Sequence, residues 1–541
     1  MKLLEKHFEI ALETPEGIAR LRELILKLAM QGKLVEQNPN DQPANLLLEE
    51  IEKEKERLLK SKLMKKQSSL DTIKKEQIPY LIPSNWKWIK LENICTLITD
   101  GAHHTPNYID DGVPFLSVKN LSSGKIDFDD TKFISEAEHL ELTKRCKPEY
   151  NDILLTKIGT TGIAVTIDTD KQFSIFVSVA LLKIISDKVY PKFIENLINS
   201  PLVKKYSKDG TEGVGNKNLV LRKIREYIIP LPPLEEQKRI VEKIDQLMLL
   251  CDKLEEERNR KNKLQLQINS AAINNLIKAN DEISFNKAWS FITNQFDTLY
   301  TVKQNVTVLK DATLNLAIKG KLITKNVQNN EIDIISSKKH IVNEKDYPFS
   351  LPKGWKWLVL DDLGLTQTGT TPATKNSEYY GDYIPFIGPG DIKNQVINYT
   401  NLSLTELGLE KARLIPSYSI MMVCIGGSIG KLAINDRDVA CNQQINTITP
   451  YSNIDLKYLF AVLQSSYFQN QIVSNSSGSA TPIINKQKWI SIPIPVPPYE
   501  VQKVISNKVD ELFKLCDMLE KNIEQSSKKQ SQILNSVLAQ V

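Results

Sequence analysis

The chain contains Leu231-Pro232-Pro233-Leu234-Glu235-Glu236-Gln237-Lys238 and, near its other end, Val496-Pro497-Pro498-Tyr499-Glu500-Val501-Gln502-Lys503. After each copy, apolar residues recur at alternating spacings of four and three, which is the pattern of a coiled-coil seam. The prolines fit the first turn of a helix, where a missing N–H costs little. Each copy therefore predicts a helix of about 40 residues, or roughly 60 Å at 1.5 Å per residue. The seam residues are Ile240, Ile244, Leu247, Cys251 and Leu254 in the first copy, and Ile505, Val509, Leu512, Cys516 and Leu519 in the second.

We expect the two seams to pack against one another as an antiparallel pair within the chain. A C-terminal helix has to bury its apolar stripe, and the central helix offers a matching one. Cys251 and Cys516 occupy equivalent seam positions and are interpreted as small core residues. Pairing between helices of two chains is left open by the pattern.

Two further motifs recur in the same order. Leu28–Leu34 (LAMQGKL) returns as Leu316–Leu322 (LAIKGKL), and Pro83–Trp88 (PSNWKW) returns as Pro352–Trp357 (PKGWKW). The chain is therefore predicted to be two tandem copies of one module, since solenoid repeats are several-fold shorter. The interval between these two motifs is longer in the first copy, which places an insertion around the charged stretch 46–66. Two such modules would make a pseudo-twofold object, which suits a target with two separated half-sites.

Composition is that of a multidomain protein without a membrane span. The chain has 541 residues, of which 41% are hydrophobic and 25% charged, and no apolar run is long enough to span a bilayer. The six cysteines include no Cys-x-x-Cys pair, so neither a disulfide framework nor a zinc site is indicated, and a reducing cytoplasm is the expected setting. The net charge of +5 permits nucleic-acid binding without requiring it.

Between the helical segments the pattern favours short strands with Gly, Pro, Asn and Asp breaks. The segments 153–159 and 419–426 are predicted to be buried strands that end at glycine, and 173–185 is a further strand region. We interpret the chain as mixed α/β, with two α/β domains separated by the two long antiparallel helices. The predicted divisions are a helical segment with the charged insertion (1–77), a first domain (78–230), a helical spacer (231–347), a second domain (348–495) and a C-terminal helix (496–541).

Three motifs resemble catalytic or metal sites but lack the residues that such sites need. Val496-Pro497-Pro498-Tyr499 resembles the Asp/Asn-Pro-Pro-Tyr loop of amino-group methyltransferases, yet the side chain of Val496 cannot accept a hydrogen bond from an amine. The stretch 426–431 (GGSIGK) has neither the glycine spacing nor the Ser/Thr after lysine of a phosphate loop. His103 and His104 are adjacent without clustered carboxylate or cysteine ligands, so a metal site is not favoured there.

The three paired motifs together resemble the specificity subunit of type I restriction–modification enzymes. Gly369-Thr370-Thr371-Pro372, followed by Tyr379-Tyr380-Gly381-Asp382-Tyr383-Ile384-Pro385-Phe386, resembles the start of that family's target recognition domains. The resemblance implies that each domain reads one half of a bipartite, asymmetric DNA sequence, and that the long helices set the gap between the halves. Successive turns of DNA lie about 34 Å apart, a separation that helices of this length could hold.

The same resemblance implies the partners and the cofactors. Two modification subunits, which carry S-adenosylmethionine and methylate adenine, would dock on this chain, and restriction subunits would complete an ATP-dependent, magnesium-using nuclease. The chain itself would bind double-stranded DNA and would be non-catalytic. It would bind neither a membrane nor a cofactor. Where the second copy has Gly369–Pro372, the first has Gly101-Ala102-His103-His104-Thr105-Pro106, which suggests that the two domains read different bases.

Candidate DNA contacts are polar residues of loops. Asn and Gln can pair with adenine, and Lys can reach guanine or phosphate. The candidates are His103, His104, Thr105, Lys119, Asn120, Lys157, Thr160, Thr161, Lys217 and Asn218 in the first domain, and Thr370, Thr371, Lys375, Lys393, Ser428, Lys431, Asn442, Gln443, Gln444 and Lys486 in the second.

Two other functions are open to the sequence. A self-contained DNA methyltransferase would need a cofactor glycine loop and the Asp/Asn-Pro-Pro-aromatic motif, and both are missing. A coiled-coil scaffold would use the two α/β domains to bind proteins. Pulldown from the native host separates the hypotheses, because a methyltransferase partner supports DNA recognition and other partners support the scaffold.

Overall fold

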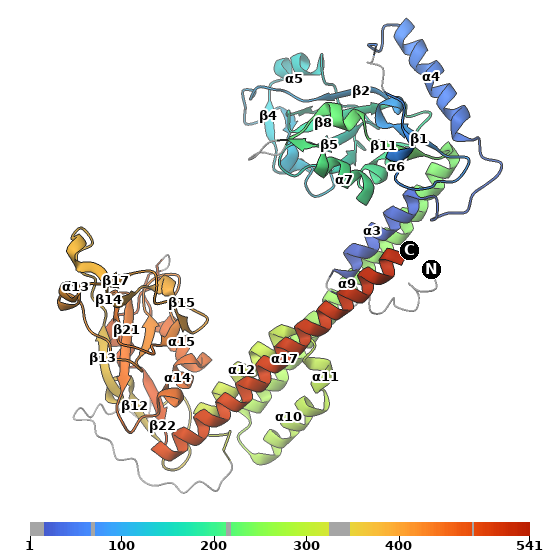
Figure 1. Ribbon diagram of the computed structural model, residues 1–541. Coiled ribbons are helices and arrows are strands. Elements are labelled where there is room, and N and C mark those ends of the chain that lie inside the picture. Colours follow the sequence, from blue (N-terminus) through green and yellow to red (C-terminus); the bar gives the residue numbers. More distant parts are fainter. Residues whose placement is uncertain are drawn as a thin grey trace. The chain divides into compact units, whose positions relative to one another are not determined.

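The computed structural model describes residues 14, 16–66, 71–212, 218–323, 347–478 and 481–540. These residues fall into two units, Met1–Asn259 with Ser527–Val541, and Arg260–Ser526 (Figure 1). Both long helices are continuous across this division: α9 (Leu234–Lys278) has 45 residues and α17 (Tyr499–Gln540) has 42, as the seam pattern predicted. None of the helices in the described residues is long and apolar enough to cross a membrane.

The first unit holds a four-stranded antiparallel sheet of order β2-β8-β5-β6 and a three-stranded sheet of order β4-β3-β7. In the second sheet, β3 runs parallel to β7. All four residues of β5 are buried, so this strand forms the centre of the core between the helices and the second sheet. The elements are α3 (Gly17–Met30), α4 (Ala44–Lys60), β1 (Lys87–Lys90), β2 (Cys95–Asp100), β3 (Val113–Leu116), β4 (Lys132–Ile134), α5 (Glu136–Thr143), β5 (Ile153–Thr156), β6 (Ala164–Thr166), β7 (Ser174–Ile175), β8 (Val179–Ile184), α6 (Pro191–Ile198), α7 (Pro201–Asp209), β9 (Thr211–Glu212), β10 (Asn218–Leu219), α8 (Leu221–Arg225) and β11 (Ile228–Leu231).

The second unit repeats this topology. Its sheets have the orders β13-β21-β18-β19 and β17-β14-β20, and β14 runs parallel to β20. Helices α10 and α11 lie between α9 and α12 in the chain. The elements are α10 (Glu282–Asn294), α11 (Phe296–Leu299), α12 (Lys303–Ile318), β12 (Lys356–Val359), β13 (Gly364–Thr368), β14 (Tyr380–Ile387), β15 (Ile392–Lys393), β16 (Val396–Ile397), β17 (Ser403–Leu404), α13 (Glu406–Glu410), β18 (Ile420–Val423), β19 (Leu432–Ile434), β20 (Ala440–Cys441), β21 (Ile445–Pro450), α14 (Leu456–Gln464), α15 (Ser466–Asn475), α16 (Lys486–Ile490) and β22 (Pro493–Val496).

The strands predicted at 153–159, 173–185 and 419–426 are confirmed by β5, by β7 with β8, and by β18. Their predicted ends are wrong for β5 and β18, which stop three residues before the glycine, at Thr156 and Val423. The charged insertion is largely the helix α4, which buries only Ala44, Leu47 and Ile51. The prolines stand just before the long helices and not inside their first turn. The carbonyl oxygens of Pro233 and Pro498 accept the first helical hydrogen bonds, from the backbone N–H groups of Gln237 and Gln502.

The Gly-Lys-Leu and tryptophan motifs meet in space in each unit. Gly32 follows α3 with a φ of +69°, and Gly320 follows α12 with a φ of +67°. A Cβ atom on Gly32 would lie 2.5 Å from Cγ of Pro83, and one on Gly320 would lie 2.6 Å from Cγ of Pro352. Glycine is therefore required twice over, by the left-handed backbone and by the close approach of the proline.

The proline-pair motif joins the same junction through its glutamine. The strand β1 pairs with β11, and β12 pairs with β22, so each tryptophan motif lies beside the strand that leads into a long helix. Gln237 is fully buried; its Oε1 accepts from the N–H of Tyr190 at 2.9 Å, and its Nε2 donates to the carbonyl of Pro232 at 3.0 Å. Gln502 makes the same two bonds, to Asp455 and Pro497. The repeated glutamine thus holds each α/β domain to the start of its long helix.

The prediction that the two sets of seam residues contact each other is wrong. Seam residues Ile240, Ile244 and Cys251 are buried in the core of the first unit together with residues of α3, and Leu247 and Leu254 pack against that core. Ile505 and Val509 are buried in the second unit with residues of α12. The reason is that α3 and α12, which lead into the Gly-Lys-Leu motifs, cover the beginning of the adjacent long helix.

The two long helices nevertheless pack together within the second unit, where they run antiparallel (Figure 1). Cys516 of α17 is buried in one cluster with Ala272, Ile273 and Leu276 of α9, and Leu519 packs against that cluster. Residues of α10, α11 and α12 complete the cluster, so the contact is part of a core that five helices share. Leu512 is half-buried. The partner of Cys516 is thus the later part of α9, and not Cys251.

Candidate nucleic-acid interface

In the first unit, the loops that follow β2, β3, β5 and β7 are hydrogen-bonded into one surface. The backbone N–H of Ala102 donates to Ile175 at 2.9 Å, and the N–H of Lys157 donates to the carbonyl of Ser178 at 2.9 Å. The Ser178 hydroxyl accepts from the N–H of Val118 at 3.1 Å. Backbone pairing of this kind fixes the loops while leaving many of their side chains free. It brings together the candidates around His103, Lys119, Lys157 and Thr160.

Asp100, the last residue of β2, lies at the centre of this surface. Its Oδ2 binds the ammonium of Lys157 at 2.8 Å, and only 5–6% of either side chain is exposed. Its Oδ1 lies 2.9 Å from Nε2 of His103 and 2.7 Å from Nη2 of Arg145. Burial opposes ionisation of Asp100, but hydrogen bonds from Lys157 and His103 outweigh that effect, so the pKa of this carboxyl lies below its ordinary value.

The second unit builds the corresponding surface from different side chains. The N–H of Thr370 donates to Cys441 at 2.9 Å, and the N–H of Cys424 donates to Gln444 at 2.7 Å. The hydroxyl of Thr371 donates to Oε1 of Gln443. The N–H of Asn442 donates to Ile387 at 3.1 Å. The loops after β13, β14, β18 and β20 are therefore joined as in the first unit.

Strand register gives the equivalent positions in the two surfaces. Asp100 pairs with Ala180 on β8, and Thr368 pairs with Asn446 on β21. Lys157 directly follows β5, as Cys424 follows β18. In the second unit, therefore, the buried ion pair is absent and Thr368 donates instead to Oδ1 of Asn446 at 2.7 Å. The backbone frame is shared, and the polar groups that it presents differ.

The candidates differ in how far they are exposed. The exposed ones are His103, His104, Thr105, Lys119, Thr160, Lys375, Lys393, Lys431 and Gln443. The partly buried ones are Thr161, Asn218, Thr370, Thr371, Ser428, Asn442, Gln444 and Lys486. Asn120 and Lys157 are buried, and Lys217 lies outside the described residues.

Some candidates have structural partners. Asn120 is not a solvated loop residue: its Nδ2 donates to the carbonyls of Asp127 and Asp130, and its Oδ1 accepts from the N–H of Ser117. Lys486 donates to the carbonyl of Thr366 at 2.8 Å. These three bonds of Asn120 fix the turn after β3, which is a sufficient reason for an asparagine there.

Two arginines at these surfaces, Arg145 and Arg413, are not among the candidates. Arg145 donates to the carbonyl of Asp100 at 2.6 Å, and Arg413 donates to the carbonyl of Thr368 at 2.6 Å. The sequence does carry a signal for them, since each copy contains Arg-x-x-Pro at this place, ending at Pro148 in the first copy and at Pro416 in the second.

Both repeats of the chain match the model of one known protein family. The family model for the type I restriction modification DNA specificity domain matches residues 83–266 and 352–528, which begin at the two tryptophan motifs and include both surfaces. The chain belongs to this family. It is the DNA-specificity subunit of a type I restriction–modification system, the non-catalytic part of such an enzyme.

Curated relatives extend the similarity over nearly the whole chain. The chain is 25% identical to the type I restriction enzyme EcoEI specificity subunit of Escherichia coli, over 96% of this chain and 93% of the relative. It is 26% identical to the EcoAI specificity subunit of the same species, with the same coverage. A solved chain from work on complex assembly and conformational transition of the type I R-M system aligns with a TM-score of 0.50 and 15% identity, covering 85% of this chain and 98% of that one. This last match concerns the fold alone.

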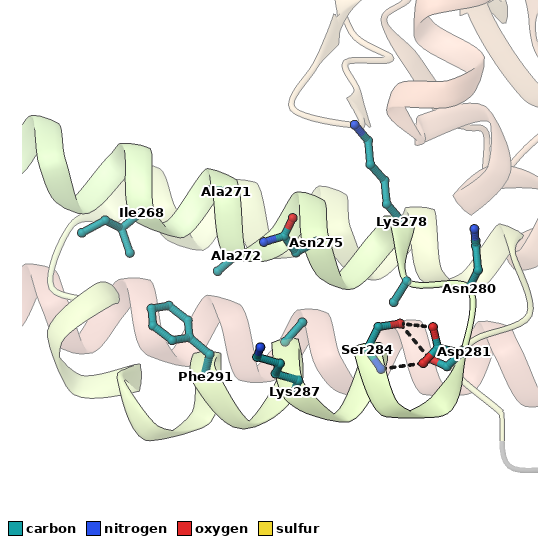
Figure 2. A pocket seen from close by; sticks show the side chains of 12 residues that line it. Ile268, Ala271, Ala272, Asn275, Lys278, Asn280, Asp281, Ser284, Lys287 and Phe291 are labelled. Atoms are coloured by element: carbon teal, nitrogen blue, oxygen red, sulfur yellow. Dashed lines mark hydrogen bonds between the residues drawn. The ribbon is translucent and has the colours of Figure 1, made fainter.

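The glycine-rich stretch 426–431 lies between the antiparallel strands β18 and β19 of this specificity subunit. A phosphate loop joins a strand to a helix, whereas 426–431 joins two antiparallel strands, which agrees with the rejection of a phosphate loop there. A separate pocket of about 670 Å³ lies between α10 and the last turns of α9 (Figure 2). Alanines form much of its lining, and Asp281 caps α10 at its rim by accepting from the N–H of Ser284 at 2.8 Å. It is formed by the helical hairpin and not by the loops of the surfaces described above.

Acid should destabilise the first domain through His139 of α5. This side chain is buried, and its Nδ1 lies 2.9 Å from the hydroxyl of Ser174. Burial lowers the pKa of His139 below its ordinary value. Because the pKa of His139 is lowered on folding, the unfolded chain binds the proton first as the pH falls. The contribution of the buried, neutral His139 to stability is therefore intact above about pH 6.5 and is lost as the pH falls below that value. In urea titrations from pH 8 to pH 5, His139→Gln should show a smaller decline in unfolding free energy than the wild type. Equal declines would contradict this prediction.

Proposed function

We propose that the two domains, 78–230 and 348–495, each read one half of a bipartite, asymmetric DNA sequence. The observation that carries the proposal is the shared loop frame with different polar groups at equivalent positions. The first surface offers His103 beside a buried Asp100–Lys157 pair, and the second offers Thr371 with Gln443. A common frame supports the same kind of ligand at both surfaces, and different hydrogen-bonding groups would select different bases.

The chain would direct the chemistry of other subunits and perform none itself. Under this proposal two modification subunits supply S-adenosylmethionine and adenine methylation, and restriction subunits supply ATP- and magnesium-dependent translocation and cleavage. Exposed apolar side chains on the long helices, such as Leu249 and Leu250 on α9 and Leu515 and Met518 on α17, suit protein contacts of this kind. We also propose a reducing cytoplasm as the setting of the chain, in keeping with six cysteines that form no disulfide in the described residues.

A domain exchange tests the two-reader proposal. Replacing 348–495 with the corresponding domain of a related chain should change one half of the methylated sequence and leave the other half intact, because the contacts of the first domain are untouched. Removing one or two turns from α9 should instead change the gap length and leave both halves readable. Adenine methylation mapped across a genome, with the modification subunits present, gives the readout. A swap that rewrites both halves, or a native motif that is continuous and palindromic, would sink the proposal.

A further inference from the structure

Arg145 and Arg413 hold equivalent places in the two domains. Each follows a short helix, α5 or α13, and each lies 45 residues after the strand-end residue whose carbonyl it binds. The bond lengths are also equal, at 2.6 Å. Both carbonyls belong to residues that immediately precede the glycine of the first recognition loop, Gly101 or Gly369. The arginine therefore stands beside the same loop in both domains.

The surroundings of the two arginines differ. The strand-end residue is Asp100 in one domain and Thr368 in the other, and the residue after the central strand is Lys157 in one and Cys424 in the other. If the two domains read different bases, a residue that both domains keep is unsuited to reading bases, and at the DNA surface it would contact something common to all DNA sequences. The phosphate backbone is that common feature, and phosphate contacts set the register of a protein on DNA without selecting bases.

Charge and exposure fit a phosphate contact. The Arg145 side chain is 55% exposed, and its hydrogen bonds within the described residues all leave from Nη2, so Nε and Nη1 remain open. Asp100 is already neutralised by the buried ammonium of Lys157, which leaves the Arg145 charge in excess. Arg413 is exposed, and no carboxylate pairs with it in the part of the chain that the structure describes. An anchored guanidinium with a free edge is suited to binding a phosphate through two N–H groups.

We propose that Arg145 and Arg413 are paired phosphate-binding residues, one in each recognition domain, which set the position of the DNA without reading its sequence. The inference rests on the proposed function and adds to it a division of labour within each surface. The shared arginine anchors the backbone, and the residues that differ between domains, such as His103 and Gln443, discriminate bases.

The test uses the complex of this chain with its modification subunits and measures DNA affinity against salt concentration. Each phosphate contact contributes about 0.9 to the slope of log affinity against log salt. Arg145→Gln and Arg413→Gln should each lower the slope by about that amount, and the double variant by about twice as much. DNA affinity should fall by the same factor for duplexes that contain the recognised motif and for duplexes with a scrambled half-site. The motif mapped by genome methylation should stay unchanged.

The neighbouring Lys144 provides a matched control, because its charge is paired with Glu141 on the surface of α5. Lys144→Gln should leave the slope unchanged. Arg145→Lys keeps the charge but loses the planar fork, so it should keep the slope while weakening affinity. Arg145→Lys also serves if Arg145→Gln folds poorly, which thermal melting of the complex would reveal.

Three results would overturn the inference. A changed or relaxed base in one half of the motif would make the arginine a base reader. An unchanged slope at normal affinity would mean that it does not touch DNA, and an unchanged slope with an early melting transition would make its role structural. A wild-type complex that binds all duplexes equally would instead contradict the proposed function itself, which separates the two failures.

Discussion

Replacing Asp100 with alanine should lower the free energy of unfolding of the first unit by about 3–5 kcal/mol. The change leaves the ammonium of Lys157 buried without its counter-ion, and breaking a buried pair from one side carries a penalty of this size. The remaining partners of Asp100, His103 and Arg145, are largely exposed and can turn to solvent. Urea titration of the full chain, followed by tryptophan fluorescence, measures the effect.

The chain supplies its own control for this prediction. Thr368 and Cys424 occupy the equivalent places in the second unit. The double variant Asp100→Thr with Lys157→Cys should therefore recover most of the lost stability, because it removes both charges together. If the double variant is as unstable as Asp100→Ala, the penalty does not come from an uncompensated charge.

The Asp100–Lys157 ion pair also makes the stability of the first unit depend on pH. Because the pKa of Asp100 is lowered on folding, its contribution to stability is present above the unfolded pKa of about 3.9 and is lost as the pH falls below that value. The double variant should lose less stability than the wild type between pH 5 and pH 3.

Ile244→Asp should destabilise the first unit by about 4–5 kcal/mol. Ile244 is 1% exposed in the core that α9 shares with α3, so the change removes a buried apolar side chain and introduces a buried charge without a partner. Leu249→Asp is the matched control, since Leu249 lies on the same helix and is 56% exposed. The control should change the unfolding free energy by no more than about 0.5 kcal/mol. Equal effects from the two variants would show that helix propensity, and not burial, decides the outcome.

The long helices and the central strands could be predicted from the sequence because their signals are local. The four-three spacing after Pro233 and Pro498 identifies a buried stripe, and the apolar run at 153–155 identifies a buried strand. The stripe does not say what covers it. The covering helices α3 and α12 lie far from the seams in the chain, so the partner of the stripe had to come from the tertiary structure.

The site was harder to predict than the fold, for a related reason. Arg145 lies in the charged stretch 144–149, which has the composition of a solvated loop, and its role depends on a carbonyl 45 residues earlier. Lys157 and Asn120 have the residue types of DNA contacts, yet both are buried. The groups that bury them are distant in the sequence or follow no regular spacing. Residue type predicts the chemistry of which a side chain is capable, and only the folded chain determines which groups it meets.

Because of where the cysteines lie, the native chain should react only weakly with thiol reagents. All six are buried, and burial raises the pKa of Cys95, Cys146, Cys424 and Cys441 to about 12. Alkylation and disulfide exchange require the thiolate, which these residues hardly form at neutral pH. A single cysteine introduced on an exposed loop would therefore take up a fluorophore or a crosslinker selectively in the otherwise native protein. The path of bound DNA could then be traced by photocrosslinking one position at a time, without first removing the natural cysteines.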